Sequence, residues 1–271
     1  MTGRQRQDLW LYLPMGLIGS FYILLIVGMI VGDLQFTTIG HFQRLFAKPE
    51  IRYAIRLTLA SCALSTLLSL WVGIPLGYLL ARTRFRGKIL LDTLLDIPIV
   101  LPPLVLGISL LILFQTPPGK WCDRTWKALF GTEITYEIPS VILAQFAVCC
   151  AFVVRTMRVT FEQIAPRGEQ VARTLGCTRV QAFWLVTLPE AWRGIVTAAS
   201  ISWARALGEF GPILIFSGAT RMRTEVLSTS VFLEFSVGDL SSAVALSLLL
   251  IAVAVLVLVT MKVAGLKNPT A

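Results

Sequence analysis

The sequence predicts an all-α membrane protein with about six transmembrane helices. Of its 271 residues, 56% are hydrophobic and only 14% are charged, and the mean hydropathy is +0.77. A soluble globular domain of this length is less apolar. In addition, several runs with few or no charges reach or approach the roughly 20 residues that a helix needs to cross a bilayer.

Six segments are the predicted spans. The fifth is charged only at Arg205 and Glu209. The first is longer than the apolar region of a signal peptide and no clean cleavage site follows it, so we expect a retained helix. The bounds are Leu9–Gly32, Leu57–Leu80, Ile97–Phe114, Ile138–Val154, Gly194–Thr220 and Leu240–Met261.

Basic residues predict the orientation of these spans. Fourteen Lys and Arg residues, from Arg4 and Arg6 through the short cluster Arg82–Lys88 to Lys262 and Lys267, fall on one side, against nine on the other. Because cytoplasmic segments are enriched in Lys and Arg, both termini are expected in the cytoplasm. The net charge of +9 is then explained by topology and anionic lipid contact, not by nucleic-acid binding.

Residues typical of catalysis or metal binding are missing from the sequence. The five cysteines lack metal-ligand spacing, and His41 is the only histidine. No phosphate-binding loop of the form G-x-x-x-x-G-K-[ST] occurs. We therefore expect no catalytic site, no metal, no cofactor and no ATP hydrolysis by this chain.

The polar interval 155–193 between the fourth and fifth spans predicts two short helices. Pro166 suits the first turn of a helix, and Glu169 lies near its positive end. Val171, Ala172 and Leu175 form a narrow apolar stripe, and Gly176 is suited to a left-handed stop.

The second helix is expected to begin at Thr178, which can cap it. Val180, Phe183 and Trp184 then share one face, and Pro189 is expected to end the helix. The interval would present an apolar ridge to a partner; the alternative is an ordinary cytoplasmic loop.

This interval resembles the EAA loop of ABC importer permeases, which has the pattern E-A-A, three residues, G, nine residues, then I-x-L-P. Gly176, Leu188 and Pro189 are in register, whereas Gln170 replaces the glutamate, and Glu169 one position earlier is the alternative carboxylate. Val171 and Val186 are further departures. The resemblance implies a coupling helix that docks on a separate ATPase, with these coupling residues: Pro166, Glu169, Gln170, Ala172, Leu175, Gly176, Phe183, Leu188 and Pro189.

Three other motifs resemble the molybdate, tungstate and sulfate permeases: Gly73–Arg82, Leu94–Pro103 and Ala204–Gly211. The similarity covers roughly 52–216 and weakens at Pro212 and at Phe216–Ala219. It implies a type I importer permease fold in one domain, 1–271, with a family core over 52–261 and the coupling loop over 155–193.

Arg205 and Glu209 have i, i+4 spacing and so face the same side of a helix. Intramembrane charges persist when they are paired or face a polar cavity. They are either a structural ion pair, a translocation gate in which Gly208 and Gly211 allow close helix approach, or a group at the cytoplasmic boundary.

Other charges carry weaker expectations. Asp92 and Asp96 are expected near the cytoplasmic interface, facing Arg82–Lys88. Arg221 and Arg223 are expected on the outer side, either available to a binding protein or as ordinary solvated loop charges.

The resemblance implies an ATP-driven importer subunit of the inner membrane. Its partners would be an ABC ATPase dimer, an extracytoplasmic binding protein and a second permease chain, forming a homodimer for molybdate or tungstate and usually a heterodimer for sulfate. The alternatives are an ABC permease for ferric iron, thiamine or a polyamine, and an ion-coupled carrier or channel in which Glu209 is the only good coupling carboxylate.

Overall fold

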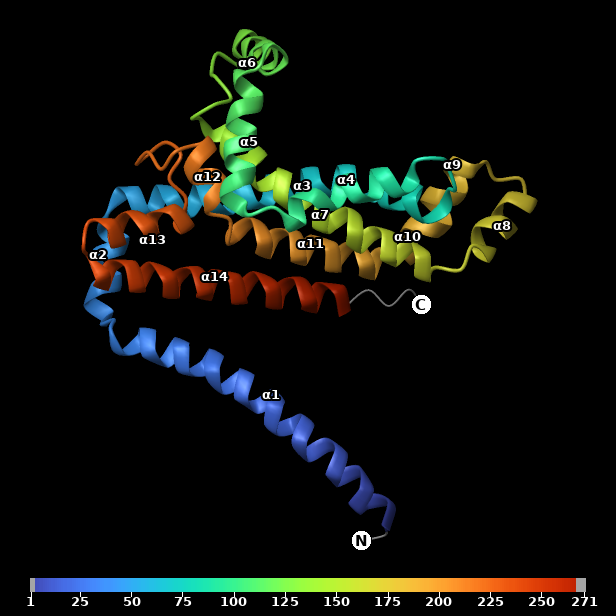
Figure 1. The fold of residues 1–271 in the computed structure, drawn as a ribbon, viewed down its shortest axis with the longest axis horizontal. Helices are drawn as coiled ribbons and strands as arrows, with labels where there is room; N and C mark the ends of the chain where they lie inside the picture. The colour runs from blue at the N-terminus through green and yellow to red at the C-terminus, as the bar shows by residue number, and fades with distance from the viewer. Residues whose placement is uncertain (1–2, 267–271) are drawn as a thin grey trace.

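A bundle of long helices forms the body of the protein. The computed structural model describes residues 3–266, with side chains for 12–38 and 40–263, and within these ranges it contains helices and turns but no strand. Lys267, counted above for orientation, lies outside the described residues. In Figure 1 four helices lie side by side: α3 (Pro49–Arg82), α7 (Ile138–Gln163), α11 (Trp192–Leu207) and α14 (Leu240–Leu266). The predicted all-α class is confirmed.

Close packing of α3 on α7 organises this bundle. A Cβ atom added at Gly77 would lie 2.7 Å from the Cβ of Met157 and 2.9 Å from the backbone nitrogen of Arg158. At Gly73 it would lie 2.5 Å from a methyl carbon of Val153. Small residues of this kind let two membrane helices approach closely without a side chain between them.

The first helix, α1 (Gly3–Gln35), runs away from the bundle from the end that also holds α2 (Ile39–Ala47), as Figure 1 shows. Its apolar side chains are exposed; Ile18, for example, is 74% exposed. The predicted span Leu9–Gly32 is thus one continuous helix that packs little on its own chain.

The predicted span Ile97–Phe114 is not one continuous helix. Helix α4 (Lys88–Val100) ends before a sharp bend of 113°, and α5 (Pro103–Gln115) continues from it. Leu101 and Pro102 are extended there, because Pro102 and Pro103 each disfavour a helical conformation in the residue before them. Helix α5 stands across the bundle, with α6 (Pro117–Phe130) at its far end (Figure 1).

The predicted span Gly194–Thr220 is also divided. Helix α11 ends at Leu207, and a short helix α12 (Gly211–Phe216) follows after a break. The described residues therefore contain four helices that are long and apolar enough to cross a membrane, or five if α4 and α5 count as one broken span. This is fewer than the predicted six.

A last short helix, α13 (Leu227–Ser236), lies with α2 at one end of the bundle (Figure 1). The segment between α7 and α11 projects from the opposite end (Figure 1).

Candidate functional site

The projecting segment contains the first predicted loop helix, α8 (Arg167–Thr174). Because α7 continues to Gln163 and α11 begins at Trp192, the loop itself is shorter than the predicted interval 155–193. Pro166 is the N-cap residue, and Gly176 has the left-handed φ of +96° that its predicted role requires. The amide of Cys177 donates to the Ala172 carbonyl at 3.0 Å, which closes the helix end.

The second predicted helix begins as expected. Thr178 caps α9 (Arg179–Ala182): its hydroxyl accepts from the Gln181 amide at 3.2 Å, and its own amide donates to the Gln181 side chain at 2.9 Å. This reciprocal pair is a capping box, which satisfies two amides that the helix start leaves free.

The prediction that Pro189 ends this helix is wrong. A π-helical turn, η1 (Phe183–Thr187), leads into α10 (Leu188–Glu190) and almost directly into α11. Pro189 has no N–H and its ring would clash with the carbonyl four residues earlier. The wider turn just before it, in which the Leu188 amide donates to the Phe183 carbonyl, accommodates the proline.

Glu169 ties α8 to the bundle. Its Oε1 accepts a hydrogen bond from the Tyr78 hydroxyl of α3 at 2.8 Å, and its Oε2 accepts one from the Thr187 hydroxyl at 3.5 Å. Gln170, which occupies the glutamate position of the EAA pattern, is exposed. The carboxylate that contacts the helices is therefore the one displaced by a single position.

Aromatic packing also attaches the loop to the bundle. Phe183 packs on Tyr78 with ring centroids 4.7 Å apart, and Tyr78 packs on Phe161 of α7 at 5.5 Å. Phe183 thus points into the bundle, so its predicted place on one ridge with Val180 and Trp184 is wrong. Its ring also meets the exposed Trp184 ring edge-on, with centroids 5.7 Å apart.

The loop exposes several large apolar side chains. Five side chains, which we call the loop surface, are between 50% and 81% exposed: Val171, Leu175, Val180, Trp184 and Leu185. The remaining predicted coupling residues differ in burial: Ala172 is buried, Leu188 is half-buried, and Pro166 and Pro189 are exposed. Large apolar side chains exposed within one short loop indicate an interaction surface.

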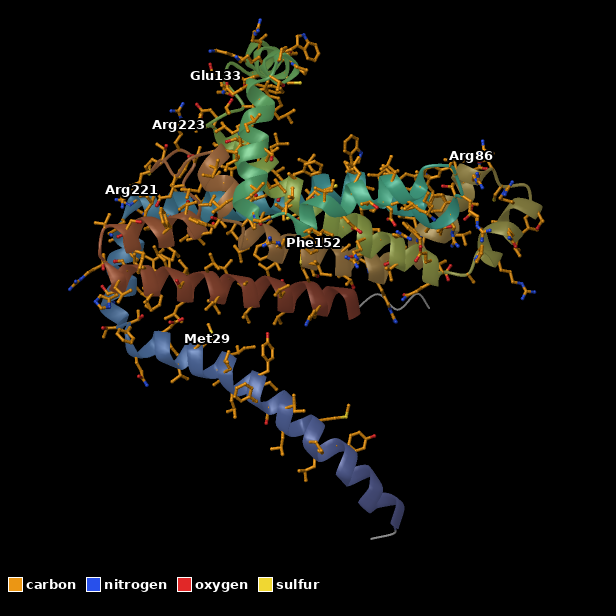
Figure 2. The ribbon with its side chains drawn as sticks, in the orientation of Figure 1. Met29, Arg86, Glu133, Phe152, Arg221 and Arg223 are labelled. Atoms are coloured by element: carbon orange, nitrogen blue, oxygen red, sulfur yellow. The ribbon has the colours of Figure 1, made fainter. Side chains whose placement is uncertain are left out.

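The Arg205–Glu209 pair forms as predicted. A guanidinium nitrogen lies 3.3 Å from Glu209 Oε2, and the Glu209 side chain is only 1% exposed against 35% for Arg205. The guanidinium carbon also lies 5.8 Å from the centre of the Phe152 ring. Figure 2 labels Phe152 where α7 and α11 run side by side.

The two glycines predicted beside this pair differ. A Cβ at Gly211 would lie 3.0 Å from the Leu104 nitrogen of α5, so another helix does approach there. At Gly208 only backbone atoms of its own helix come within 4 Å.

One predicted charge pairing differs in the structure, and two arginines form ion pairs that were not predicted. Asp92 pairs with Arg158 of α7, and not with the cluster Arg82–Lys88. Arg221 pairs with Glu234 at 3.2 Å, and Arg223 pairs with Glu137. Figure 2 shows Arg221 and Arg223 at the opposite end from Arg86 and the loop helices.

Three contributors to the loop's attachment were missed by sequence reasoning: Tyr78, Thr187 and Arg82, whose guanidinium donates to the Ile164 carbonyl at 2.8 Å. Tyr78 and Arg82 lie inside the motif Gly73–Arg82 that signalled the family. Their contacts with the loop are between residues far apart in sequence, so no local pattern shows them. No cluster of three candidate metal ligands occurs among the described residues.

Comparison with known proteins identifies the family. Residues 73–267 match the family model described as "Binding-protein-dependent transport system inner membrane component". The sulfate transport system permease protein CysT of Escherichia coli is 32% identical over 83% of this chain and 80% of its own. The molybdenum transport system permease protein ModB of Mycobacterium tuberculosis is 33% identical over 88% of each chain.

Solved structures show the same fold. A bacterial ABC transporter that imports the acidic polysaccharide alginate matches with a TM-score of 0.76 at 20% identity, covering 98% of this chain and 100% of the other. The MetNI methionine ABC transporter matches with a TM-score of 0.58 at 20% identity, covering 78% and 91%. The chain belongs to the inner membrane components of binding-protein-dependent transport systems, and it is a multi-pass transport subunit with the ABC transporter permease fold.

Proposed function

We propose that this chain is the permease subunit of an ATP-driven importer for tetrahedral oxyanions, with molybdate or tungstate as the substrate and sulfate as the alternative. The observation on which this rests most is the loop Pro166–Pro189. It exposes an apolar surface outward and is tied inward to two long helices through Glu169 and Phe183.

The mechanism is alternating access coupled by this loop. An ABC ATPase dimer docks on the loop surface, and ATP-driven closure of that dimer moves α8. The Tyr78–Glu169 bond and the Phe183 contact pass the movement to α3, and the Arg82–Ile164 bond connects α3 to the end of α7. The chain forms no covalent intermediate and needs no cofactor.

The transport route is proposed to pass beside α11. Arg205, Gly208, Glu209 and Gly211 surround the point where α11 ends and α12 begins. There the buried Glu209 holds Arg205 by an ion pair while over a third of the arginine side chain stays exposed.

The remaining partners follow from the same proposal. The protein lies in the cytoplasmic membrane with both termini inside, as one permease domain over 1–271 with its core over 52–261. A binding protein docks at the end that holds α2 and α13, opposite the loop. A second permease chain completes the route, and it is a second copy if the substrate is molybdate or tungstate.

The substrate class is supported by relatives whose names give it. Besides CysT and ModB, the molybdate/tungstate transport system permease protein WtpB of Pyrococcus furiosus is 36% identical over 64% of this chain and 63% of its own. The sulfate alternative is supported by the identity to CysT over 83% of this chain.

The test is uptake of labelled molybdate at low micromolar supply, in cells with and without this chain and without a second molybdate system. We expect uptake to be lost on deletion and, in cells that have the chain, to be blocked by tungstate but not by sulfate. Inhibition by sulfate as well would assign the chain to the sulfate alternative. Unchanged uptake would contradict the oxyanion assignment. The alternatives would then be an ABC permease for ferric iron, thiamine or polyamines, or an ion-coupled carrier.

A further inference from the structure

A cavity of about 860 Å³ opens along α11, where it faces α7 and α14. Phe152 contributes from α7, and Leu258 and Lys262 contribute from α14. Most of the wall belongs to α11, from Arg193 at its start to Arg205 near its end.

The charged residues that line this cavity are all basic: Arg193, Arg205 and Lys262. Arg205 already balances Glu209, so Arg193 and Lys262 leave two positive charges without a counter-charge in the wall. This residual charge matches a divalent anion.

The basic groups are spread along the cavity. Arg193 and Arg205 are twelve residues apart on α11, which corresponds to about 18 Å along the helix axis. The Thr197 and Ser200 hydroxyls between them donate to backbone carbonyls at 2.9 and 2.8 Å. Their hydrogens are therefore already used, and the binding groups for an anion are the basic side chains.

A second cavity of about 680 Å³ shares Arg193 and Thr197 with the first. It adds Arg155, and one acidic residue, Glu190. Arg193 thus stands where the two cavities meet, close to the loop.

We propose that the cavity along α11 is a binding site for a tetrahedral divalent oxyanion, held between Arg193 and Lys262 at the loop end; Arg205, about 18 Å farther along the helix, keeps its pairing with Glu209. This inference rests on the proposed function and names the residues that the anion would contact. A phospholipid headgroup offers the same chemistry, so the test must separate a free anion from a lipid.

The first measurement is molybdate uptake by the complete complex, with ATPase and binding protein, in proteoliposomes of phosphatidylcholine with phosphatidylglycerol. Arg193→Gln and Lys262→Gln are expected to lower uptake several-fold while ATP hydrolysis stimulated by the loaded binding protein is retained. Arg86→Gln, which removes an exposed charge outside the cavity, is the matched control and is expected to behave like wild type.

The second measurement does not depend on transport. Thr197→Cys, an exposed position in the cavity, is labelled with an anionic and with a cationic methanethiosulfonate reagent, against the wild-type chain as background for its five cysteines. We expect faster reaction with the anionic reagent, and protection by tungstate. Repeating both measurements in pure phosphatidylcholine should leave these results unchanged.

Wild-type uptake by both variants would contradict the proposed binding site. A labelling rate that does not depend on reagent charge or on tungstate would also contradict it. A charge preference that needs phosphatidylglycerol and is insensitive to tungstate would assign the cavity to lipid and overturn it too. If the wild-type complex moves no oxyanion but tungstate still protects the Thr197→Cys chain from labelling, the proposed function fails and the site stands.

Discussion

Tyr78 on α3 and Glu169 on α8 are joined by a 2.8 Å hydrogen bond between residues 91 positions apart. A carboxylate acceptor makes this bond stronger than one between neutral groups. Because Thr187 also donates to Glu169, one carboxylate connects both halves of the loop to the bundle. This arrangement lets the loop and α3 move together.

Replacing Glu169 with alanine should loosen the loop. Loss of a hydrogen bond to a charged group costs about 1.5–3 kcal/mol. We expect Glu169→Ala to make the loop more sensitive to protease in detergent-solubilised protein. Gln170→Ala, on an exposed neighbour, is the matched control and should keep wild-type resistance; equal cleavage of both variants would contradict the role given to Glu169.

Gly176 should tolerate only residues that accept a left-handed conformation. Its φ is +96°, and no neighbouring atom lies within 4 Å of an added Cβ, so the penalty comes from the backbone alone. Gly176→Val should cost about 1–3 kcal/mol and abolish uptake, and Gly176→Pro should abolish uptake with the protein still in the membrane. Gly176→Asn should keep most activity, and wild-type uptake by the proline variant would refute the coupling role.

Arg205 and Glu209 can be separated into structural and transport roles. Arg205→Leu leaves a carboxylate of 1% exposure without its cation, which costs about 3–5 kcal/mol. The double variant Arg205→Leu, Glu209→Leu should recover most of the thermal stability but transport no molybdate. A double variant that is both stable and active would show that the pair is only structural.

Gly77 should not accept even one extra methyl group. Its Cβ would meet a backbone atom of α7, which cannot rotate away, so Gly77→Ala should destabilise the chain by about 1–3 kcal/mol. Thermal unfolding in detergent measures this. Gly28→Ala in α1, where no atom lies within 4 Å, is the control, and a similar loss in both variants would contradict the packing described.

Acid should weaken the start of α14. Hydrogen bonds from the Ser242 hydroxyl and amide and from the Ser241 hydroxyl lower the pKa of Asp239 from 3.8 to about 2. Because the folded-state pKa is the lower one, the stabilisation is present above about pH 4 and disappears as the pH falls towards about 2. Asp239→Ala should cost about 1 kcal/mol near neutral pH and less in strong acid; a pH-independent difference in unfolding would contradict this.

Local signals predicted the loop well. Gly176, Thr178 and Pro166 perform conformational tasks that each residue type favours by itself, so their positions could be read from sequence. The turn at Pro189 could not, because a proline can end a helix or be accommodated by a widened turn. The inward packing of Phe183 could not be read either, because its partner Tyr78 lies far from it in the sequence.

The span predictions failed where an apolar run of sequence continues across a break between two helices. Ile97–Phe114 is apolar throughout, yet Pro102 and Pro103 turn the chain. Asp92 pairs with Arg158 and not with the cluster Arg82–Lys88, which is nearer in sequence, because of how α4 lies against α7. Contacts of this kind follow from tertiary packing and cannot be predicted from a single sequence.

The most direct test of the coupling claim is the number of ATP molecules hydrolysed per molybdate imported by the reconstituted complex. Wild type and Glu169→Ala should both retain the ATPase and hydrolyse ATP, because the loop surface is unchanged. The account predicts a clearly higher ratio for Glu169→Ala, since the Phe183 contact alone passes less of the ATPase motion to α3 and α7. An unchanged ratio in a stable complex would show that the loop does not couple ATP to transport through Glu169.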